Sequence, residues 1–378
     1  MAKITLVTRN FPPLTGGMER LLRQVYIGLK DHHDCDLVGP NGCRDFADRD
    51  DVISETSVSP TPLFLLFSFV KSIYRLSIAG RPDVVVGGSG LVGPVVVLLA
   101  RLFSAKSMLL VHGLDIVVES RLYQFLFVPF LRRADLVICN SKNTAELAIQ
   151  SGVRADRIEI ICPGVEIPDS PLSQTQAREL LGLHDKTMLL SVGRLIPRKG
   201  IAEFITNSFV EMASKNPNLE LWIAGGEPQS ALNKHHGSVV ESINKVVRLY
   251  RLESRIKLLG RVDDVKLQQL YAAADVFIFP LIDTPGDVEG FGMVAIEAAA
   301  YGTPTVAFDC GGVSDAVEQG GNGYLVTPGD YAEFDNRVMR VIKEQPRDQA
   351  SEYAKQFSWE NYSLKLNNCI QIALGKDK

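Results

Sequence analysis

The sequence lacks the features of a nucleic-acid binder, a disordered chain or a disulfide-stabilised domain. Its 40 basic residues face 44 acidic ones, for a net charge of -4, whereas a general nucleic-acid binder needs a basic surplus. Hydrophobic residues make up 46% of the chain and charged residues 22%, which is more apolar than a disordered chain. We therefore expect folded domains that do not bind nucleic acid.

Cysteine spacing and the lack of long apolar runs exclude further classes of protein. The six cysteines form no Cys-x-x-Cys pair, so buried reduced thiols are expected, without disulfides or metal. No apolar stretch reaches about 18 residues without a charge, so no clear membrane span is predicted. The first residues, Met1–Val7, are typical of a strand and not of a signal peptide. A cytoplasmic protein is expected.

The chain contains short Val/Ile/Leu-rich runs that alternate with segments of helical periodicity. Continuous apolar strands of this kind are buried on both faces, as in parallel sheets covered by helices. With 378 residues and roughly 150 residues per domain, about two domains are expected. The pattern predicts α/β architecture with two doubly wound Rossmann-like domains. The predicted strands are 3–7, 36–38, 83–86, 107–111, 135–139, 188–192, 220–224, 256–259, 275–279 and 304–308.

A proline-rich segment marks the domain boundary. Pro163, Gly164, Pro168 and Pro171 interrupt regular structure there, because proline and glycine disfavour helix and strand interiors. The predicted domains are 1–166 and 167–357, followed by a last helix over 358–378 with Ser358 as its N-cap.

Two candidate sites follow predicted strands of the first domain, where ligands bind in open α/β sheets. Gly16 and Gly17 precede a helix, so their backbone can approach an anion or form a turn that needs positive φ. His112 begins the segment His-Gly-Leu-Asp, which ends at Asp115. His112 can contact a sugar hydroxyl or titrate near neutrality, or be a structural histidine.

Two further candidates follow strands of the second domain. Arg194 and Lys199 lie five positions apart on a glycine-flanked loop, where they can hold a diphosphate or form a solvated basic turn. The second candidate runs from Asp287 to Ala298 and contains Gly290-Phe-Gly292. Its turn leads into a helix whose first N–H groups suit a phosphate. Glu289 and Glu297 flank that helix start and suit sugar hydroxyls better than phosphate.

Together these stretches resemble the retaining glycosyltransferases of family 4, which have the two-domain GT-B architecture. The resemblance covers nearly the whole chain, and Glu289-Gly-Phe-Gly-Met-Val-Ala-Ile-Glu297 is its most specific part. The other matching stretches are Gly16-Gly17, His112–Asp115, Val192–Leu195, Lys199-Gly200, Leu259–Val262, Gly302–Pro304 and Gly311-Gly312.

The resemblance implies roles for individual residues. Arg194 and Lys199 would neutralise the donor diphosphate, with Gly16 and Gly17 beside it. Glu289 would hold the transferred sugar as a binder in front-face attack, and His112 would contact that sugar. The roles as catalytic or donor-binding residues extend to Glu297 at the ribose, Val262 near the base, and the backbone of Phe291, Gly292, Met293 and Val294. The last helix would return to the first domain, and a deep cleft would separate the two domains.

The implied reaction moves a hexose-type sugar from a UDP- or GDP-linked donor to a glycan or lipid-linked acceptor in cell-envelope, polysaccharide or lipopolysaccharide biosynthesis. No metal or other cofactor is expected, because the nucleotide sugar is a substrate. Three alternatives stay open: a sugar-nucleotide epimerase of the same architecture, a non-catalytic carbohydrate binder, and an NAD-dependent oxidoreductase. The last rests on Gly88-Ser-Gly90-Leu-Val-Gly93, a dinucleotide fingerprint that normally follows the first strand.

Two weaker signals concern metal and membrane. Asp34-Cys-Asp36 and Asp48-Arg-Asp50 resemble metal-binding Asp-x-Asp but are better explained as solvated loops. Segments 62–78 and 121–133 combine apolar and aromatic residues with Lys or Arg. They are either ordinary buried helices or amphipathic helices in peripheral contact with the inner face of a membrane. The oligomeric state is not predicted.

Overall fold

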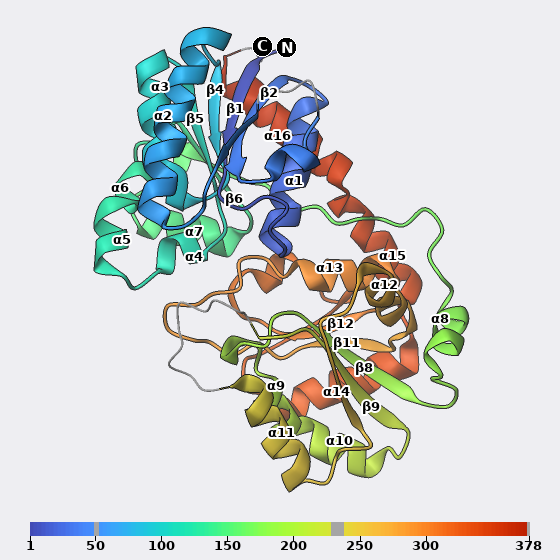
Figure 1. Ribbon diagram of the computed structural model, residues 1–378. Coiled ribbons are helices and arrows are strands. Elements are labelled where there is room, and N and C mark those ends of the chain that lie inside the picture. Colours follow the sequence, from blue (N-terminus) through green and yellow to red (C-terminus); the bar gives the residue numbers. More distant parts are fainter. Residues whose placement is uncertain (49–52, 228–237, 376–378) are drawn as a thin grey trace. The chain divides into compact units, whose positions relative to one another are not determined.

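The computed structural model describes residues 1–48, 53–227 and 238–375 and divides into two compact units. Unit 1 comprises Met1–Gly164 and Trp359–Lys378, and unit 2 comprises Val165–Ser358. The division falls inside the proline-rich segment, two residues before the predicted end of the first domain. Each unit contains one parallel sheet with helices on both sides (Figure 1).

Unit 1 is built on a seven-stranded parallel sheet in the order β3-β2-β1-β4-β5-β6-β7. Its strands β1 and β4–β6 are short runs of buried aliphatic residues, as expected for a sheet covered on both faces. The strands are β1 (Lys3–Val7), β2 (Asp34–Pro40), β3 (Ile53–Thr56), β4 (Val84–Gly87), β5 (Lys106–Val111), β6 (Leu136–Cys139) and β7 (Ile158–Ile160).

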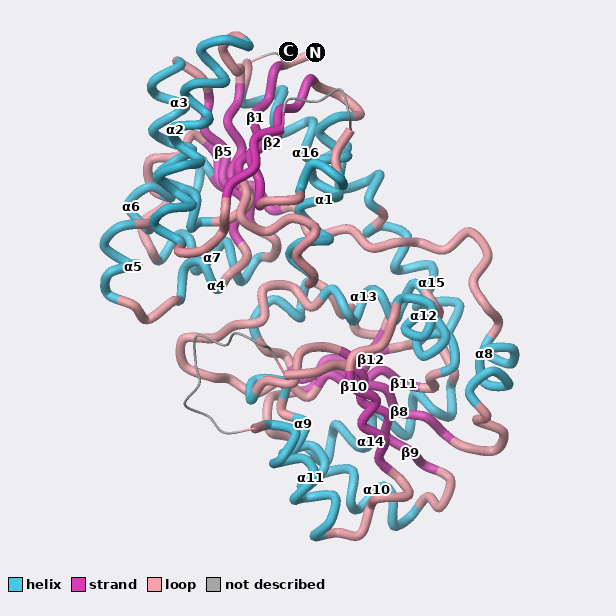
Figure 2. Tube along the Cα trace, viewed as in Figure 1, coloured by secondary structure: helices cyan, strands magenta, loops and turns pink. Residues whose placement is uncertain are grey.

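Helices cover both faces of this sheet, and a hydrophobic core lies under each layer (Figure 2). One core joins the sheet to α1 and α16, and the other joins it to α2, α3, α6 and α7. The helices are α1 (Gly17–Lys30), α2 (Thr61–Ala79), α3 (Gly93–Phe103), α4 (Leu114–Val117), α5 (Arg121–Leu126), α6 (Val128–Leu131), α7 (Lys142–Gln150) and α16 (Trp359–Ala373).

The last helix, α16, belongs to unit 1 although it follows unit 2 in the sequence. It packs along α1, where the Ser363 hydroxyl donates a 3.1 Å hydrogen bond to the Gly28 carbonyl. Tyr362, Leu366 and Ile370 bury their side chains in the core beneath α1. Apolar residues at this helical spacing form one buried face, so α16 completes the core of unit 1.

Unit 2 contains a six-stranded parallel sheet in the order β10-β9-β8-β11-β12-β13. The strands are β8 (Thr187–Val192), β9 (Leu219–Ala224), β10 (Ile256–Gly260), β11 (Val276–Phe279), β12 (Thr305–Phe308) and β13 (Gly323–Val326). The helices are α8 (Gln174–Leu181), α9 (Ile201–Phe204), a π-helical turn (Ile205–Phe209), α10 (Val210–Lys215), α11 (Val239–Leu249), α12 (Asp264–Ala273), α13 (Met293–Ala300), α14 (Tyr331–Glu344) and α15 (Arg347–Ala354).

Both sheets reverse their strand order at one point. In unit 1 the sequence-first strand β1 lies between β2 and β4, and in unit 2 β8 lies between β9 and β11. At such a switch point the loops after the two central strands diverge to opposite faces and leave room for a ligand at the carboxyl edge. Unit 2 is therefore expected to bind a ligand at the loops after β8 and β11.

The six cysteines form no disulfide, and five of them are buried, as the scattered spacing predicts. Burial raises the pKa of Cys139 to about 12, which keeps this thiol protonated near neutral pH. These cysteines therefore contribute to the packing of the units.

Candidate active site

The candidate site of unit 2 begins with two loops that meet at its switch point. The loop after β8 contains the short helical turn Pro197–Lys199, and the loop after β11 runs from Pro280 to Gly292. The Ile282 amide donates a 3.0 Å hydrogen bond to the Arg198 carbonyl. Because β8 and β11 are paired strands, this contact joins the two loops directly.

Gly200 makes this close approach of the two loops feasible. Its φ is +63°, a left-handed conformation that side chains rarely adopt. A Cβ placed there would lie 2.0 Å from the Pro280 carbonyl oxygen. The sequence signal for this glycine was its position directly after Lys199, and the structure gives the reason.

An ion cluster links the two loops. Lys199 Nζ lies 2.7 Å from Glu289 Oε2, and the Arg198 guanidinium also donates to Glu289. Arg198 Nε lies 3.1 Å from Asp287 Oδ1. The exposed fractions of the Arg198, Lys199 and Glu289 side chains are 7%, 12% and 16%. These charges are thus mostly withdrawn from water, where removing one member costs more than at a surface.

The electrostatics of the cluster favour an ionised Glu289. Burial by itself would raise the pKa of Glu289, but Lys199 and Arg198 outweigh it and lower the pKa to about 2. Burial lowers the pKa of Lys199, opposed by Glu289 and reinforced by Arg198 and Arg194. A carboxylate that stays charged at neutral pH is an acceptor for hydroxyl groups and not a proton donor.

Backbone contacts hold Glu289 at the start of α13. The Gly312 amide, from the loop after β12, donates a 2.8 Å hydrogen bond to the Glu289 carbonyl. Gly292 has φ +96° and is the N-cap of α13. A Cβ on Gly292 would lie 3.0 Å from the Phe279 ring, and Lys199 Nζ lies 4.5 Å from the centre of the same ring. Phe279 thus lies against both Lys199 and the helix start.

Helix α13 supplies backbone donors and a second carboxylate. The first hydrogen bond at its N-terminus is donated by Ala295 to the Gly292 carbonyl, so the amides of Met293 and Val294 precede it. Glu297 lies four residues after Met293, on the same face of the helix. The Tyr271 hydroxyl of α12 donates a 2.8 Å hydrogen bond to Glu297 Oε2. This bond orients Glu297 one turn beyond the helix start.

Two predicted residues of unit 2 lie at the same carboxyl edge but outside the ion cluster. Arg194 is exposed, on the loop that also holds Lys199. Val262 is half-buried after β10, beyond Arg261, whose side chain lies over Gly226. Strand β9 separates β10 from β8 in the sheet, which places Val262 at the periphery of the site.

The unit 1 candidates lie around β1, β4 and β5. Gly16 and Gly17 are the N-cap and first residue of α1, after the loop that follows β1. The Asn10 side chain donates to Glu19 Oε1 at 2.9 Å, and a Cβ on Gly16 would lie 2.4 Å from Glu19 Oε2. The Glu19 carboxylate therefore lies beside this helix start, where its negative charge interacts favourably with the helix dipole.

His112 follows β5 and contacts the loop after β4. Its Nε2 lies 3.0 Å from the Gly88 carbonyl oxygen, and since a carbonyl only accepts, Nε2 carries the proton. In the neutral ring the lone pair is then on Nδ1, which is buried without a hydrogen-bond partner among the described residues. Asp115 accepts a 3.2 Å hydrogen bond from the His112 amide. Burial raises the pKa of Asp115, while His112 opposes the shift.

The competing motifs have structural explanations. The glycines of Gly88-x-Gly90-x-x-Gly93 follow β4, and a Cβ on Gly90 would lie 3.0 Å from Asp115 Cβ and 3.3 Å from the Tyr123 hydroxyl. Gly90 thus allows close packing of side chains rather than an open pyrophosphate cradle.

The Asp-x-Asp signals lie away from the unit 1 candidates where the structure describes them. Asp34 and Asp36 lie at the amino end of β2, the edge of the unit 1 sheet opposite to His112, and Asp36 is buried. Asp48 pairs with Lys30 at 2.7 Å, whereas Arg49 and Asp50 lie outside the described residues. Within the described ranges no cluster of three potential ligands could hold a metal ion.

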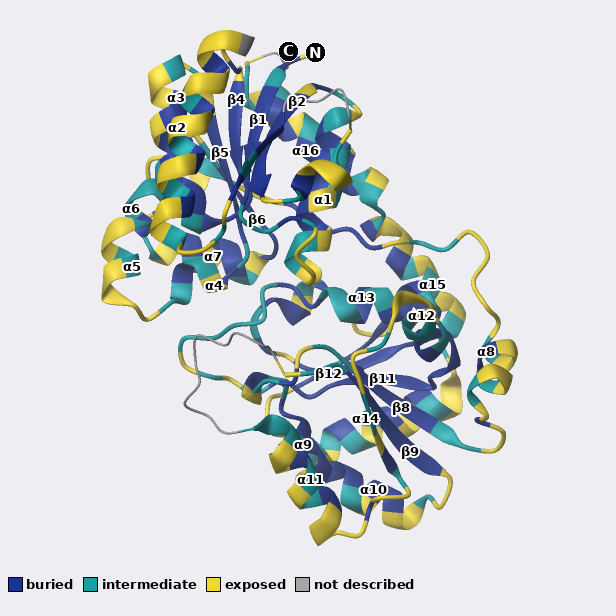
Figure 3. Cartoon of the chain, in the orientation of Figure 1, coloured by how far each residue is buried: buried dark blue, intermediate teal, exposed yellow. Residues whose placement is uncertain are grey.

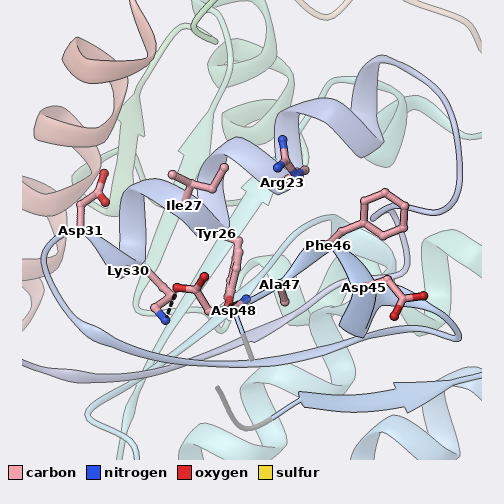
Figure 4. Close-up of a pocket in the computed structure, with 9 residues that line it drawn as sticks. All are labelled: Arg23, Tyr26, Ile27, Lys30, Asp31, Asp45, Phe46, Ala47 and Asp48. Carbon is pink, nitrogen blue, oxygen red and sulfur yellow. Dashed lines mark hydrogen bonds and ion pairs between the residues drawn. The ribbon is translucent and has the colours of Figure 1, made fainter. Parts of the chain in front are cut away.

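A cavity of about 410 Å³ lies elsewhere in unit 1, between α1 and the segment around Asp45–Asp48 (Figure 4). None of the predicted site residues lines it. Figure 4 shows the ion pair of Lys30 and Asp48 at its edge. This cavity is therefore not at the strand ends where the predicted chemistry lies.

Sequence reasoning missed two contributors to the site, Arg198 and Tyr271. Arg198 stands in the same basic loop as Lys199, but nothing in a loop sequence indicates that its side chain turns inward to Asp287 and Glu289. Tyr271 lies on a different helix from its partner Glu297. These contacts are between residues distant in sequence, 91 positions apart for Arg198 and Glu289.

The comparisons with known proteins agree with this architecture. The family model described as Glycosyl transferases group 1 matches residues 173–357, and the model described as Glycosyltransferase Family 4 matches residues 15–167. The two matches account for all but 1–14, 168–172 and 358–378. The chain therefore belongs to the family 4 glycosyltransferases, which are enzymes.

Relatives and solved structures resemble different extents of the chain. D-inositol 3-phosphate glycosyltransferase from Mycolicibacterium smegmatis is 30% identical over 232 residues, which are 60% of this chain and 50% of that protein. The chain thus spans about half the length of the curated relatives it matches.

HepE from Anabaena, solved in complex with UDP, is 23% identical with a TM-score of 0.79, covering 98% of this chain and 99% of that one. Sucrose-phosphate synthase from Thermosynechococcus elongatus is 23% identical with a TM-score of 0.78, covering 100% of both chains. These structures establish the GT-B fold of two Rossmann-like domains.

Proposed function

We propose that the protein is a retaining glycosyltransferase that moves a hexose-type sugar from a nucleotide-diphosphate sugar to a glycan or lipid-linked acceptor. The observation that supports this most is the Lys199–Glu289 pair, at 2.7 Å, beside the start of α13 at the switch point of unit 2. Cation, sugar-binding carboxylate and helix amides there match the three parts of a nucleotide sugar.

The departing diphosphate requires positive charge that is already in place. As the glycosidic bond breaks, negative charge grows on the leaving phosphate, and preorganised donors lower the barrier most. Lys199, Arg194 and the amides of Met293 and Val294 supply these donors in our proposal. Because they are part of the protein, we propose that transfer needs no metal ion, and that EDTA leaves the rate unchanged.

Glu289 is proposed to bind the sugar rather than to attack it. Two cations already bind its Oε2, so the carboxylate is stabilised and its nucleophilicity is reduced. An ionised carboxylate accepts hydrogen bonds from sugar hydroxyls. The acceptor then attacks from the face that the diphosphate leaves, and the anomeric configuration is retained.

Glu297 is proposed to bind the ribose, and His112 to contact the transferred sugar. The Tyr271 bond holds Glu297 at a fixed position on α13. Gly16 and Gly17 would lie beside the diphosphate and Val262 near the base.

The donor is proposed to be a UDP-linked sugar, with a GDP-linked sugar as the alternative. HepE was solved with UDP and with UDP-glucose, which supports this choice. The relatives named D-inositol 3-phosphate glycosyltransferase make a phosphorylated polyol a second acceptor to test. We propose a cytoplasmic location at the inner face of a membrane, with a role in cell-envelope polysaccharide or lipopolysaccharide synthesis.

A product assay separates the alternatives. The protein is incubated with UDP-glucose, UDP-galactose or GDP-mannose, with and without candidate acceptors, and nucleoside diphosphate release and the product anomer are measured. Acceptor-dependent release with retained configuration is expected. An epimerase would form product without acceptor, and a binder would release nothing.

Variants of the site complete the test. Lys199→Ala and Arg194→Ala are each expected to lower turnover at least about a hundredfold, the usual cost of losing one preorganised donor. Arg248→Ala, which removes an exposed arginine of α11, is the matched control. Near-normal turnover in both site variants, with folding intact, would remove the phosphate role.

A further inference from the structure

Helix α2 divides its apolar side chains between the core of unit 1 and the surface. The side chains it buries are Phe64, Ser68, Ser72 and Leu76, spaced four residues apart. This stripe packs toward β2, β3 and α3, and two of its four members are serines. A surface helix normally buries its apolar face and exposes its polar one.

Leu65, Phe69 and Ile73 are partly buried against the core, but a further set of large apolar side chains of α2 is exposed. Their exposed fractions run from 44% for Leu63 to 70% for Ile78. The set is Leu63, Leu66, Phe67, Val70, Tyr74 and Ile78. Single exposed apolar residues are ordinary, but an apolar stripe along a whole helix indicates an interaction surface.

Neighbouring helices extend this surface. Helix α3 exposes Leu98 and Leu102, and α5 exposes Leu122, Phe125 and Leu126. Contacts connect α2 to α3, α3 to α6, and α6 to α5, so the helices form a continuous layer on one side of unit 1. Figure 3 shows exposed residues along α2, α3 and α5 on that side. We call these residues and the exposed stripe of α2 the apolar face.

The charges within the helices of the apolar face have one sign. The segments of α2, α3, α5 and α6 contain no Asp or Glu. The cations within them or directly after α6 are Lys71, Arg75, Arg101, Arg121, Arg132 and Arg133, all exposed. Over the described part of the chain, none of the six forms an ion pair with a carboxylate. Glu119, just before α5, and Asp135, just after Arg133, are the nearest exposed acids in sequence to this layer.

Length and burial decide how the apolar face can meet a bilayer. Thr61–Ile78 is long and apolar enough to cross a membrane, and 22% of it is buried. However, Phe64 and Leu76 are buried in unit 1, so the helix could cross a membrane only by leaving the hydrophobic core. A helix with one stripe in the protein and the other apolar can only lie on the surface, among headgroups and upper acyl chains.

We infer that the apolar face docks unit 1 on an anionic lipid bilayer. The apolar side chains enter the interface while the six cations meet lipid phosphates. A second copy of the chain fits less well, because a two-fold contact through this face would oppose six cations to the same six. The inference deepens the proposed function by naming where the enzyme acts.

The face also lies near the edge where an acceptor must arrive. Helix α2 starts after β3 and α5 lies shortly after β5, so the first turn of α2 and all of α5 are close to the carboxyl ends of the strands. His112 is at that same edge of unit 1. A lipid-linked acceptor in the bilayer would thus have its head group beside the unit 1 candidates.

The test is co-sedimentation of the full chain with vesicles. One set contains phosphatidylcholine alone, the other phosphatidylcholine with phosphatidylglycerol, each at low and high salt. Binding to the anionic set at low salt, weakened by salt because the charges are screened, is expected. No sedimentation with the anionic vesicles at low salt would overturn the inference.

Variants separate the two contributions. Leu66→Gln with Phe67→Gln and Phe125→Gln removes apolar contact, and Arg75→Glu with Arg101→Glu reverses charge. Each is expected to lower the partition coefficient at least about tenfold, given about fivefold per basic residue at an anionic surface. The controls are Leu180→Gln with Leu249→Gln and Lys245→Glu with Arg248→Glu, equally exposed in unit 2.

Further outcomes keep the inference distinct from the proposed function. Membrane docking would be overturned if the unit 2 controls lowered the partition coefficient as much as the apolar-face variants. It would also be overturned if sedimentation velocity showed a dimer that dissociates in the apolar variant. Thermal stabilisation by UDP-glucose is measured on every variant, and the apolar-face variants are expected to retain it. Vesicle binding without any donor binding would leave the docking surface standing and refute the transferase site.

Discussion

Replacing Arg198 by alanine removes a guanidinium that contacts both Asp287 and Glu289. Its side chain is 7% exposed, with Nε 3.1 Å from Asp287 Oδ1. After the change, Glu289 keeps Lys199 at 2.7 Å, but Asp287 loses this partner and a cavity remains. Removing one member of a buried pair usually costs about 3–5 kcal/mol. Because Glu289 keeps a cation and Asp287 is 24% exposed, we expect about 3 kcal/mol.

Thermal unfolding of unit 2 measures this loss. For a domain of about 150–250 residues each kcal/mol lowers Tm by roughly 2–4 °C, so Arg198→Ala is expected to lower it by roughly 6–12 °C. Turnover should fall as well, because a misplaced Glu289 no longer meets the sugar. Arg198→Lys keeps the positive charge but loses the two-pronged guanidinium. Its Tm and turnover should lie between those of the wild type and Arg198→Ala.

Arg194→Ala is the matched comparison, since Arg194 is exposed on the same loop. Its Tm should be close to that of the wild type, because surface changes rarely exceed about 0.5 kcal/mol, while its turnover falls. If Arg198→Ala melts within about a degree of the wild type, the buried ion cluster does not stabilise unit 2 and the reasoning is refuted.

Three further predictions concern the remaining site residues. Glu289 has a pKa lowered from 4.5 to about 2, so its contribution to stability is complete above pH 4.5 and is lost as the pH falls toward 2. Glu289→Gln should therefore be less stable than the wild type at pH 7 and should lack this part of the pH dependence in urea titrations. Stability curves of variant and wild type that run parallel from pH 7 to pH 2 would contradict the prediction. Tyr271→Phe removes the 2.8 Å bond to Glu297 and should raise KM for the donor about tenfold or more with a smaller effect on kcat, since a hydrogen bond to a charged group is worth about 1.5–3 kcal/mol and about 1.4 kcal/mol is tenfold. An unchanged KM would show that this bond does not position Glu297. His112→Ala should lower kcat/KM with little change in Tm, because its ring makes a hydrogen bond to one carbonyl, that of Gly88; a Tm loss with normal kcat/KM would mark His112 as structural.

The fold was largely predictable because buried parallel strands are recognisable as aliphatic runs. Each of the ten predicted strands overlaps a strand of the structure. The three strands that were not predicted, β3, β7 and β13, are edge strands of their sheets. In β3 and β7 polar residues interrupt the apolar run, as in Ile158-Glu-Ile160, so these two sequences lack the continuous apolar signal.

The site was predictable where function depends on local sequence and not where it depends on tertiary contacts. Glycine-flanked loops at strand ends indicated Lys199 and Glu289. Their partner Arg198 was missed because loop residues have no periodicity that gives the direction of a side chain. For segment 62–78 composition left open whether the helix is buried or exposed. The structure shows that Ser68 and Ser72 are buried while six large apolar side chains of the same helix are exposed.

A thermal-shift panel of nucleotide sugars tests the central claim most directly. A ligand at 100 times its Kd stabilises the protein by about 2.7 kcal/mol, which corresponds to roughly 5–11 °C for unit 2. We predict such a shift with UDP- or GDP-linked hexoses in the wild type and its loss in Lys199→Ala. No shift with any nucleotide-diphosphate sugar, or an equal shift in Lys199→Ala, would contradict the account.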